Sequence, residues 1–168
     1  IGQGFLLATP LQLTVMTASL ANGGFIVRPR LIRDTEPVPA QPIGIDAQHL
    51  ALVNSAMYKV VNRPSGTAYD SSILINGNRM NGKTGTVQVR RISKDERESG
   101  VLSNKELDWH LRDHSLFVGY APHKNPRYAI SIVIEHGGGG AYVAAPIARD
   151  IMAELLRNEG RAREARAS

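Results

Sequence analysis

Met80-Asn81-Gly82-Lys83-Thr84-Gly85-Thr86-Val87-Gln88-Val89 is the stretch of sequence that decides the fold of this chain. Glycine, lysine and threonine precede a Val-x-Val alternation, a pattern typical of a strand that turns a polar face to a cleft. Alternation places Lys83, Gly85 and Val87 on one face, and Thr84, Thr86 and Gln88 on the other. We expect an edge strand, whose backbone pairs with an extended peptide and whose threonine hydroxyls hold a carboxylate. Gly85 would let such a ligand approach the backbone closely.

The same stretch also satisfies the P-loop motif for nucleotide phosphates. Residues 77–84 match G-x-x-x-x-G-K-[ST], and residues 132–135 resemble an apolar strand that ends in a metal-binding carboxylate. The P-loop mechanism requires a helix to begin at the lysine, so that its N-terminus faces the phosphates. Here Gly85 and the β-prone residues 86–89 follow, which favours a strand and predicts no nucleotide binding. A simpler alternative is a glycine-rich turn that enters an ordinary strand.

Composition limits the class of protein. The 168 residues are enough for one domain with a sizeable core, but the absence of a methionine before Ile1 leads us to expect a piece of a longer protein. Without cysteine there are no disulfides and no thiolate metal sites. The net charge of +5 and pI of about 9.8 favour an anionic partner or surface. Basic and aromatic residues do not cluster, which argues against nucleic acid. No apolar run is long enough to span a membrane, so any targeting segment is expected upstream of Ile1.

Two helices are predicted before the lysine strand. Thr9 as N-cap, Pro10 and Gln12 form a helix start with a capping box, and this helix should run to about Ala21. Asp46 caps the second helix, which should run to Pro64. The residues predicted to be buried are Leu11, Val15, Met16, Ala18 and Leu20 in the first helix, and Leu50, Val53, Met57 and Val60 in the second. Between the helices we expect a short or edge strand at residues 25–32, broken by Pro29, and a loop at residues 36–43.

The second half of the chain predicts a sheet covered on both sides. Residues 114–121 and 127–135 are the clearest strands, and the five-residue turn 122–126 should pair them as a hairpin. Both alternating sets of positions in these strands are apolar, which indicates helices on both faces. A final helix from Val143 should pack on the sheet through Ile147, Ala148, Ile151, Met152, Leu155 and Leu156. The predicted fold class is therefore α/β (α+β), with an antiparallel sheet between helices, in a domain of residues 1–156 followed by a polar tail at 157–168.

A charged insertion separates the lysine strand from the hairpin. We expect residues 93–100 to be a solvated loop and residues 104–111 to be a short helical stretch. His110 and His114 are four residues apart, a spacing that binds zinc on a helix. The pair spans a predicted boundary between helix and strand, which would break that geometry. We therefore predict no metal site and no cofactor.

Five motifs occur in order along the chain: residues 1–4 with 8–12, then 66–68, 82–88, 111–114, and 121–122 with 125–126. With them the chain resembles the C-terminal half of the transpeptidase domain of class B penicillin-binding proteins, most closely the penicillin-binding protein 2 group of Gram-negative bacteria. The K-T-G at residues 83–85 is a known motif of penicillin-binding proteins. The family's S-x-x-K and S-x-N motifs are absent from these 168 residues. The resemblance therefore implies about half of a penicillin-binding-protein/β-lactamase-like domain.

In this family a serine attacks the penultimate D-Ala carbonyl of a peptidoglycan stem peptide, D-Ala leaves, and an amine from a neighbouring strand resolves the acyl-enzyme. The resemblance implies that Lys83 supplies positive charge beside the serine of the missing S-x-N motif. Thr84 and Thr86 would hold the terminal carboxylate of the peptide or of a β-lactam. The backbone N–H of Thr86 would form an oxyanion hole together with the backbone N–H of the nucleophilic serine, which is absent from this chain. Gly85 and Gln88 would belong to the same substrate-binding strand.

Two points about this strand are open in the sequence. Lys83 alternates away from Thr84 and Thr86, so strand twist or a bulge is expected to bring the three together. Gly82 and Gly85 fit close packing under a helix as well as they fit a role in substrate binding.

The resemblance also implies partners and a location. The expected partners are the upstream half of the domain, peptidoglycan stem peptides, β-lactams and proteins of the cell-elongation machinery. The expected location is the periplasmic face of the inner membrane, with an anchoring helix outside this chain. Without the serine motifs, the chain alone should be inactive toward penicillin. The alternative is a non-catalytic folding or interaction module that completes or recognises a partner surface.

Overall fold

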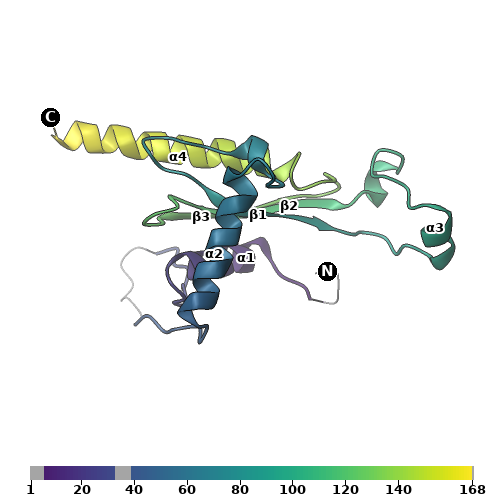
Figure 1. Cartoon of the computed structure of the whole chain (residues 1–168), viewed down its shortest axis with the longest axis horizontal. Helices are drawn as coiled ribbons and strands as arrows, with labels where there is room; N and C mark the ends of the chain where they lie inside the picture. The colour runs from purple at the N-terminus through teal and green to yellow at the C-terminus, as the bar shows by residue number, and fades with distance from the viewer. Residues whose placement is uncertain (1–5, 33–38, 168) are drawn as a thin grey trace.

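A three-stranded antiparallel sheet forms the middle of the computed structural model, which describes residues 6–32 and 39–167 (Figure 1). Its strands are β1 (Asn81–Val87), β2 (His114–Ala121) and β3 (Tyr128–Ile134), in the order β1-β2-β3. Both pairings keep a one-to-one register without a bulge. The predicted hairpin is confirmed. Within the described residues β1 is an edge strand, as predicted.

Helices lie on both faces of the sheet, which confirms the predicted fold class (Figure 1). Helix α4 (Ala144–Ala167) covers one face and α1 (Pro10–Ala21) covers the other. Helix α2 (Ala47–Asn62) passes from one side of the sheet to the other and packs against β1. Helix α2 crosses β1 near the start of the strand, where Asn54 and Asn62 contact Asn81 and Met80, and it leaves the later residues, Lys83 to Val87, uncovered.

The core lies between α4 and the sheet. Phe117 of β2 and Met80 before β1 are fully buried against α4, where the buried residues include Ala148, Met152 and Leu156. The other residues predicted to pack there are 37–42% exposed: Ile147, Ile151 and Leu155. The prediction was wrong for this second stripe because small residues set the inner face. The fully buried side chains of Ala144, Ala145 and Ala148 let the helix approach the sheet closely.

Helix α4 also runs past its predicted end near Leu156 and continues to Ala167. Residues 157–167 of the predicted polar tail are therefore helical. An ion pair of 2.5 Å between Arg127 Nη2 and Glu159 Oε2 attaches this extension to the turn before β3.

Helix α1 begins as predicted but faces the sheet with unexpected residues. The Gln12 N–H donates to Thr9 Oγ1 at 3.2 Å and the Thr9 N–H donates to Gln12 Oε1 at 2.8 Å, which completes the capping box. Thr17 and Ser19 are its buried residues, whereas Leu11 is 59% exposed and Met16 is 46% exposed. The prediction was wrong for Leu11 and Met16, whereas Val15, Ala18 and Leu20 are half-buried, because apolar residues occur around most of the helix and their pattern does not determine the face that meets the sheet.

Helix α2 is capped by Asp46 as predicted, with its Oδ1 accepting from the Gln48 N–H at 2.7 Å. Leu50, Met57 and Val61 are buried, whereas Val53 is exposed. The expected strand at residues 25–32 was wrong, because this segment forms only one isolated bridge, between Phe25 and Pro42. Residues 33–38 of this region and of the predicted loop lie outside the described residues.

The charged insertion joins the end of β1 to the start of β2 and extends away from the sheet (Figure 1). The loop predicted at residues 93–100 contains a short helix, α3 (Lys94–Ser99), with Ser93 as its N-cap. The loop prediction was wrong because Ser93 Oγ accepts from the Glu96 N–H at 3.1 Å and starts a helical turn. Residues 104–111 form turns and a single 3₁₀ turn, η2 (Trp109–Leu111), in place of the helical stretch that was expected.

Candidate functional site

An open cleft of about 730 Å³ lies along β1. Five successive residues of the strand line it, from Lys83 to Val87. Thr67 from the turn after α2, Leu116 of β2 and residues 139–142 before α4 complete the lining. The structure therefore brings Lys83, Thr84, Gly85 and Thr86 together in one cleft. Gln88 does not line this cleft and lies one residue beyond the end of β1.

The side chains of Lys83 and Thr84, both on β1, meet the side chain of Thr67 from the turn after α2. Lys83 Nζ donates to the Thr84 carbonyl oxygen at 2.7 Å and lies 3.5 Å from Thr84 Oγ1. Thr84 Oγ1 is 3.2 Å from Thr67 Oγ1. Of the two expected explanations, strand twist or a bulge, the bulge is absent, because Lys83 pairs with Val118 and Thr84 pairs with Phe117 in unbroken register. The length of the lysine side chain, which folds back over the strand, brings its ammonium group to the threonine face.

Thr67 is a site residue that was not predicted. It belongs to the motif at residues 66–68, and its distance of 3.2 Å from Thr84 Oγ1 identifies it as part of the cleft. The turn is held in place by Gly66, where an added Cβ would lie 2.3 Å from the Val60 carbonyl oxygen. The close approach of this turn to α2 therefore positions Thr67.

A buried hydrogen-bond network fixes the start of β1. Asn81 Nδ2 donates to Tyr120 Oη at 2.6 Å and to the Asn54 carbonyl oxygen at 3.0 Å. Tyr120 Oη in turn donates to Asn54 Oδ1 at 2.9 Å, and Asn62 Nδ2 donates to the Met80 carbonyl oxygen at 2.8 Å. Burial raises the pKa of Tyr120, which keeps its hydroxyl protonated as a donor. Helix α2 thus clamps β1 through side chains that sequence analysis did not identify.

Gly82 packs against a ring of the sheet and does not line the cleft. A Cβ at Gly82 would lie 2.1 Å from Phe117 Cζ, so only glycine fits between the two strands here. At Gly85 the nearest atom to an added Cβ is Leu116 Cβ, at 3.2 Å. The two glycines therefore differ: the packing interpretation holds for Gly82, with Phe117 in place of the expected helix, while Gly85 is part of the cleft.

The opposite wall of the cleft is the loop before α4. A Cβ at Gly140 would lie 2.4 Å from the Gly85 carbonyl oxygen, so the loop backbone rests directly on β1. Ser115 holds this loop, because its Oγ accepts from the Ala144 N–H at 3.1 Å and lies 3.3 Å from the Gly139 carbonyl oxygen. The fully buried Ser115 therefore sets the width of the cleft from beneath.

Two other sites considered from the sequence, the P-loop at residues 77–84 and a zinc site at His110 and His114, do not have the geometry that they require. The strand continues from Lys83 to Val87, so the helix that a P-loop requires is absent. His110 lies in η2, while His114 lies in β2 and accepts from the His136 N–H through its Nδ1 at 2.9 Å. No three His, Asp or Glu side chains are grouped to hold a metal ion in residues 6–32 and 39–167. Over the same residues, no helix has both the length and the apolar character needed to cross a membrane.

Comparison with known proteins gives consistent matches. The family described as "Penicillin binding protein transpeptidase domain" matches residues 1–153. The peptidoglycan D,D-transpeptidase MrdA of Salmonella typhimurium strain SL1344 is 35% identical over 167 residues, which cover 93% of this chain and 26% of that protein. The chain therefore spans about a quarter of the length of this relative.

Solved structures of penicillin-binding protein 2 share the fold. The complex of this protein with MreC from Helicobacter pylori matches with a TM-score of 0.75 and 30% identity, over 95% of this chain and 26% of that chain. The Pseudomonas aeruginosa protein in complex with WCK 5153 matches with a TM-score of 0.66 and 36% identity, over 93% of this chain and 31% of that chain. Both likenesses extend over nearly all of the chain.

Proposed function

Because the chain belongs to the penicillin-binding protein transpeptidase family, we propose that it forms the substrate-binding part of a peptidoglycan D,D-transpeptidase. The observation that carries the proposal is the meeting of Lys83 Nζ, Thr84 Oγ1 and Thr67 Oγ1 beside the open edge of β1. An ammonium group and two hydroxyls are the donors that a carboxylate requires, and the edge strand offers backbone groups to an extended peptide.

The proposed reaction is acyl transfer through a serine on the upstream half of the domain. The serine oxygen bonds to the penultimate D-Ala carbonyl carbon, and the bond to the terminal D-Ala nitrogen breaks as that nitrogen takes up a proton. An amine of a neighbouring stem peptide then attacks the ester, forms the cross-link and releases the serine. A β-lactam would acylate the same serine but has no terminal D-Ala to release.

Each proposed role rests on the position of a residue in the cleft. Thr84 and Thr86 hold the terminal carboxylate, and Lys83 adds positive charge beside the nucleophile. The N–H of Thr86 completes the oxyanion hole, a contact whose loss costs about 3–4 kcal/mol of transition-state stabilisation. Gly85 admits the peptide backbone to the strand. The proposed role of Gln88 in substrate binding has less support than its neighbours' roles, because Gln88 lies outside the cleft and beyond the end of β1. Only the end of a bound peptide would reach it.

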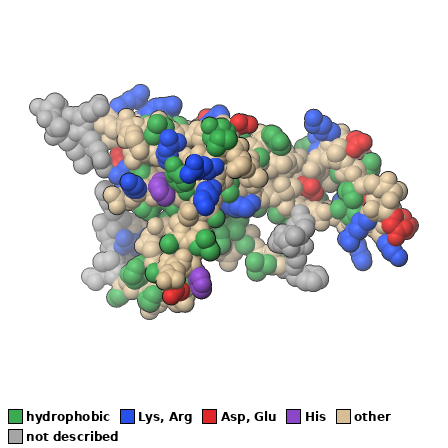
Figure 2. Space-filling view, viewed as in Figure 1, with side chains coloured by type: hydrophobic (Ala, Val, Ile, Leu, Met, Phe, Trp, Pro, Cys, Tyr) green, Lys and Arg blue, Asp and Glu red, His purple; other side chains and the backbone are tan. Residues whose placement is uncertain are grey.

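The upstream half is the first proposed partner. Exposed apolar side chains remain on both covering helices: Leu11 and Met16 on α1, and Ile147, Ile151 and Leu155 on α4. Figure 2 shows hydrophobic side chains at the surface over the helices and the sheet. The outer edge of β3 is unpaired within the described residues, so the sheet has room to continue. These surfaces fit the remainder of a domain of which this chain is one part.

Two further expectations follow from the relatives. The Helicobacter pylori protein forms a complex with MreC, which supports a partner of the same kind from the elongation machinery for this chain. A peptidoglycan cross-linking enzyme works where its substrate is, so we place the active domain on the periplasmic side of the inner membrane. The membrane anchor of this proposal would lie on another segment.

The test is covalent labelling with a fluorescent penicillin, followed on a denaturing gel. The 168 residues alone should give no labelled band, whereas the same residues joined to the upstream half, called here the rejoined domain, should be labelled. The control is the rejoined domain with alanine at the nucleophilic serine. A labelled band from the 168 residues alone would overturn the half-site proposal. An unlabelled rejoined domain that folds would favour the alternative of a non-catalytic interaction module.

A further inference from the structure

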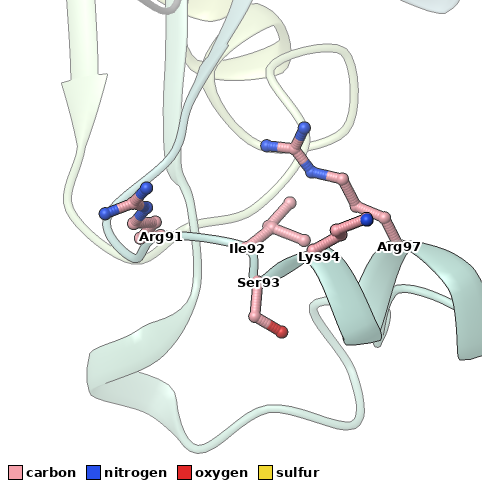
Figure 3. Close-up of a pocket in the computed structure, with 5 residues that line it drawn as sticks. All are labelled: Arg91, Ile92, Ser93, Lys94 and Arg97. Atoms are coloured by element: carbon pink, nitrogen blue, oxygen red, sulfur yellow. The ribbon is translucent and has the colours of Figure 1, made fainter.

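A basic pocket of about 510 Å³ lies in the charged insertion, outside the cleft already described (Figure 3). Its lining consists of Arg91, Ile92, Ser93, Lys94 and Arg97. In Figure 3 Arg91 and Arg97 lie on opposite sides of Ile92, and Lys94 lies between Ile92 and Arg97. The pocket thus combines three cationic side chains with one apolar side chain and has no carboxylate in its lining.

Two of these cations have no counter-charge. Arg90 and Glu96 form a two-point ion pair, with Arg90 Nη1 donating to Glu96 Oε2 at 2.7 Å. This pair raises the pKa of Arg90 and lowers that of Glu96, so both stay charged and occupied with each other. Arg91 and Arg97 form no ion pair or side-chain hydrogen bond with any residue in the described parts of the chain. Uncompensated guanidinium groups around one pocket favour a carboxylate or another anion.

The insertion is anchored to the substrate strand. The Arg90–Glu96 pair ties α3 to the chain that leaves β1, and the Ser93 cap fixes the first turn of α3. Lys94 and Arg97 are three positions apart, so they share one side of the helix and face the pocket together. Asp95 and Glu98 do not line the pocket. The pocket is therefore held at a defined distance from the end of β1.

A peptide bound along β1 can leave the cleft in one direction. Towards the start of the strand the cleft ends at the buried Asn81 and Gly82. Towards its end the strand opens at Val87, and Arg91 follows four residues later. An extended chain rises about 3.3 Å per residue, so at most about 17 Å separate Thr86 from Arg91, roughly the length of five peptide residues.

We propose that the pocket between Arg91 and Arg97 binds a side-chain carboxylate of the stem peptide whose terminal carboxylate lies at Thr84 and Thr86. This inference rests on the proposed function. Stem peptides carry free carboxylates on the acidic residues that precede the D-Ala pair, and these lie within the span from the cleft to the pocket. A penicillin is too short to occupy both places. The pocket therefore contributes to binding of the natural substrate and not to acylation by the antibiotic.

The test uses the rejoined domain and two soluble stem peptides. One peptide has free side-chain carboxylates, and in the other they are amidated. For the double variant Arg91→Gln/Arg97→Gln we expect the KM for the free peptide to rise about fivefold to tenfold with little change in kcat, since each exposed ion pair contributes only modestly to binding. The KM for the amidated peptide should change less than about twofold.

The matched control is Arg63→Gln/Lys105→Gln, which removes two exposed cations outside the pocket, one of them in the same insertion. An equal rise in KM for the two peptides, an equal effect of the control, or no effect at all would overturn the inference. Binding to vesicles with 30% phosphatidylglycerol that the double variant loses, with KM unchanged, would assign the pocket to a lipid surface and also overturn it. Penicillin labelling at the wild-type rate shows that the proposed function stands whatever the peptides give. A rejoined domain that takes no label would overturn both.

Discussion

The two ends of β1 have opposite environments. Asn81 and Gly82 at its start are buried and packed against α2 and Phe117, whereas the segment from Lys83 to Val87 lines an open cleft. At the buried end every neighbour is fixed by hydrogen bonds or by close packing. At the open end the side chains face solvent and contact each other. An edge strand can therefore offer loosely packed donors to a ligand because its other end is clamped.

This contrast predicts that mutations at the two ends have separable effects. Changes at the open end should alter acylation and leave the free energy of unfolding nearly unchanged. Changes at the buried end should lower the free energy of unfolding first. Each prediction below concerns the rejoined domain.

The largest effect is expected at Thr86, in the open end. Thr86→Pro removes the backbone N–H of the proposed oxyanion hole, so the rate of penicillin acylation should fall about 100-fold to 1,000-fold. Thr86→Ala keeps that N–H and loses one hydroxyl contact to a carboxylate, so its rate should fall only about tenfold. Stopped-flow acylation with a chromogenic β-lactam measures both rates. If the two variants slowed acylation equally, the N–H would have no special role, and a large loss of stability in Thr86→Pro would place that N–H in the sheet.

The next effect is expected at Asn81, in the buried end. Asn81→Leu removes the donor to Tyr120 Oη and to the Asn54 carbonyl oxygen and leaves buried polar groups without partners. The free energy of unfolding should therefore fall by about 2–3 kcal/mol. Urea denaturation followed by circular dichroism measures it. Gln88→Leu, one residue beyond the exposed end of β1, is the control and should change stability by less than about 0.5 kcal/mol. Similar values for the two variants would contradict the clamp.

The two glycines give a matched pair on one strand. Gly82→Ala places a Cβ 2.1 Å from Phe117 Cζ, so the fully buried ring must move, and stability should fall by about 2 kcal/mol. Gly85→Ala meets only Leu116 Cβ, at 3.2 Å, and should cost less than about 1 kcal/mol. Thermal unfolding of both variants measures the difference. If Gly85→Ala proved the more damaging of the two, the division of the strand into a packed part and an open part would be wrong.

Local signals in the sequence predicted much of the fold. The Thr9–Gln12 capping box, the Asp46 cap and the turn at residues 122–126 act within a few residues, and each gave the correct element. The lysine strand and its edge position were also predicted from alternation and glycine content. The same alternation predicted that this strand turns a polar face to a cleft, and Lys83, Thr84 and Thr86 line one cleft in the structure. The roles of these residues came from the family resemblance and not from the local pattern.

What the sequence missed depends on contacts between distant segments. The network of Asn54, Asn81 and Tyr120 joins α2, β1 and β2 across separations of 27, 39 and 66 positions, and no local pattern marks it. The face of α1 was misassigned in part because the buried positions hold Thr17 and Ser19, and one face of α4 was misassigned because alanines are buried beside larger apolar residues that stay exposed. A pattern of apolar residues cannot separate a face that covers this sheet from a face left for another segment. Thr67 was missed because the motif at residues 66–68 does not show that its threonine lies beside Thr84, 17 positions later in the chain.

The smallest predicted effect is a pH dependence at the buried end. The backbone N–H of His123 donates to the carbonyl oxygen of Arg79, two residues before β1, at 2.7 Å. The centre of the His123 ring lies 4.7 Å from the centre of the Tyr58 ring. Burial lowers the pKa of His123 below 6.5, and the positive charge of Lys124 lowers it further. Tyr58, Arg79, His123 and Lys124 line one pocket of about 380 Å³. A lowered folded-state pKa means that the unfolded state binds the proton more readily, so this contribution to stability is present above pH 6.5 and is lost as the pH falls below it. We expect His123→Gln to unfold with a weaker dependence on pH between 7.5 and about 5 than the wild type, measured by urea denaturation. An unchanged pH dependence in His123→Gln would show that this histidine does not couple protonation to the clamp on β1.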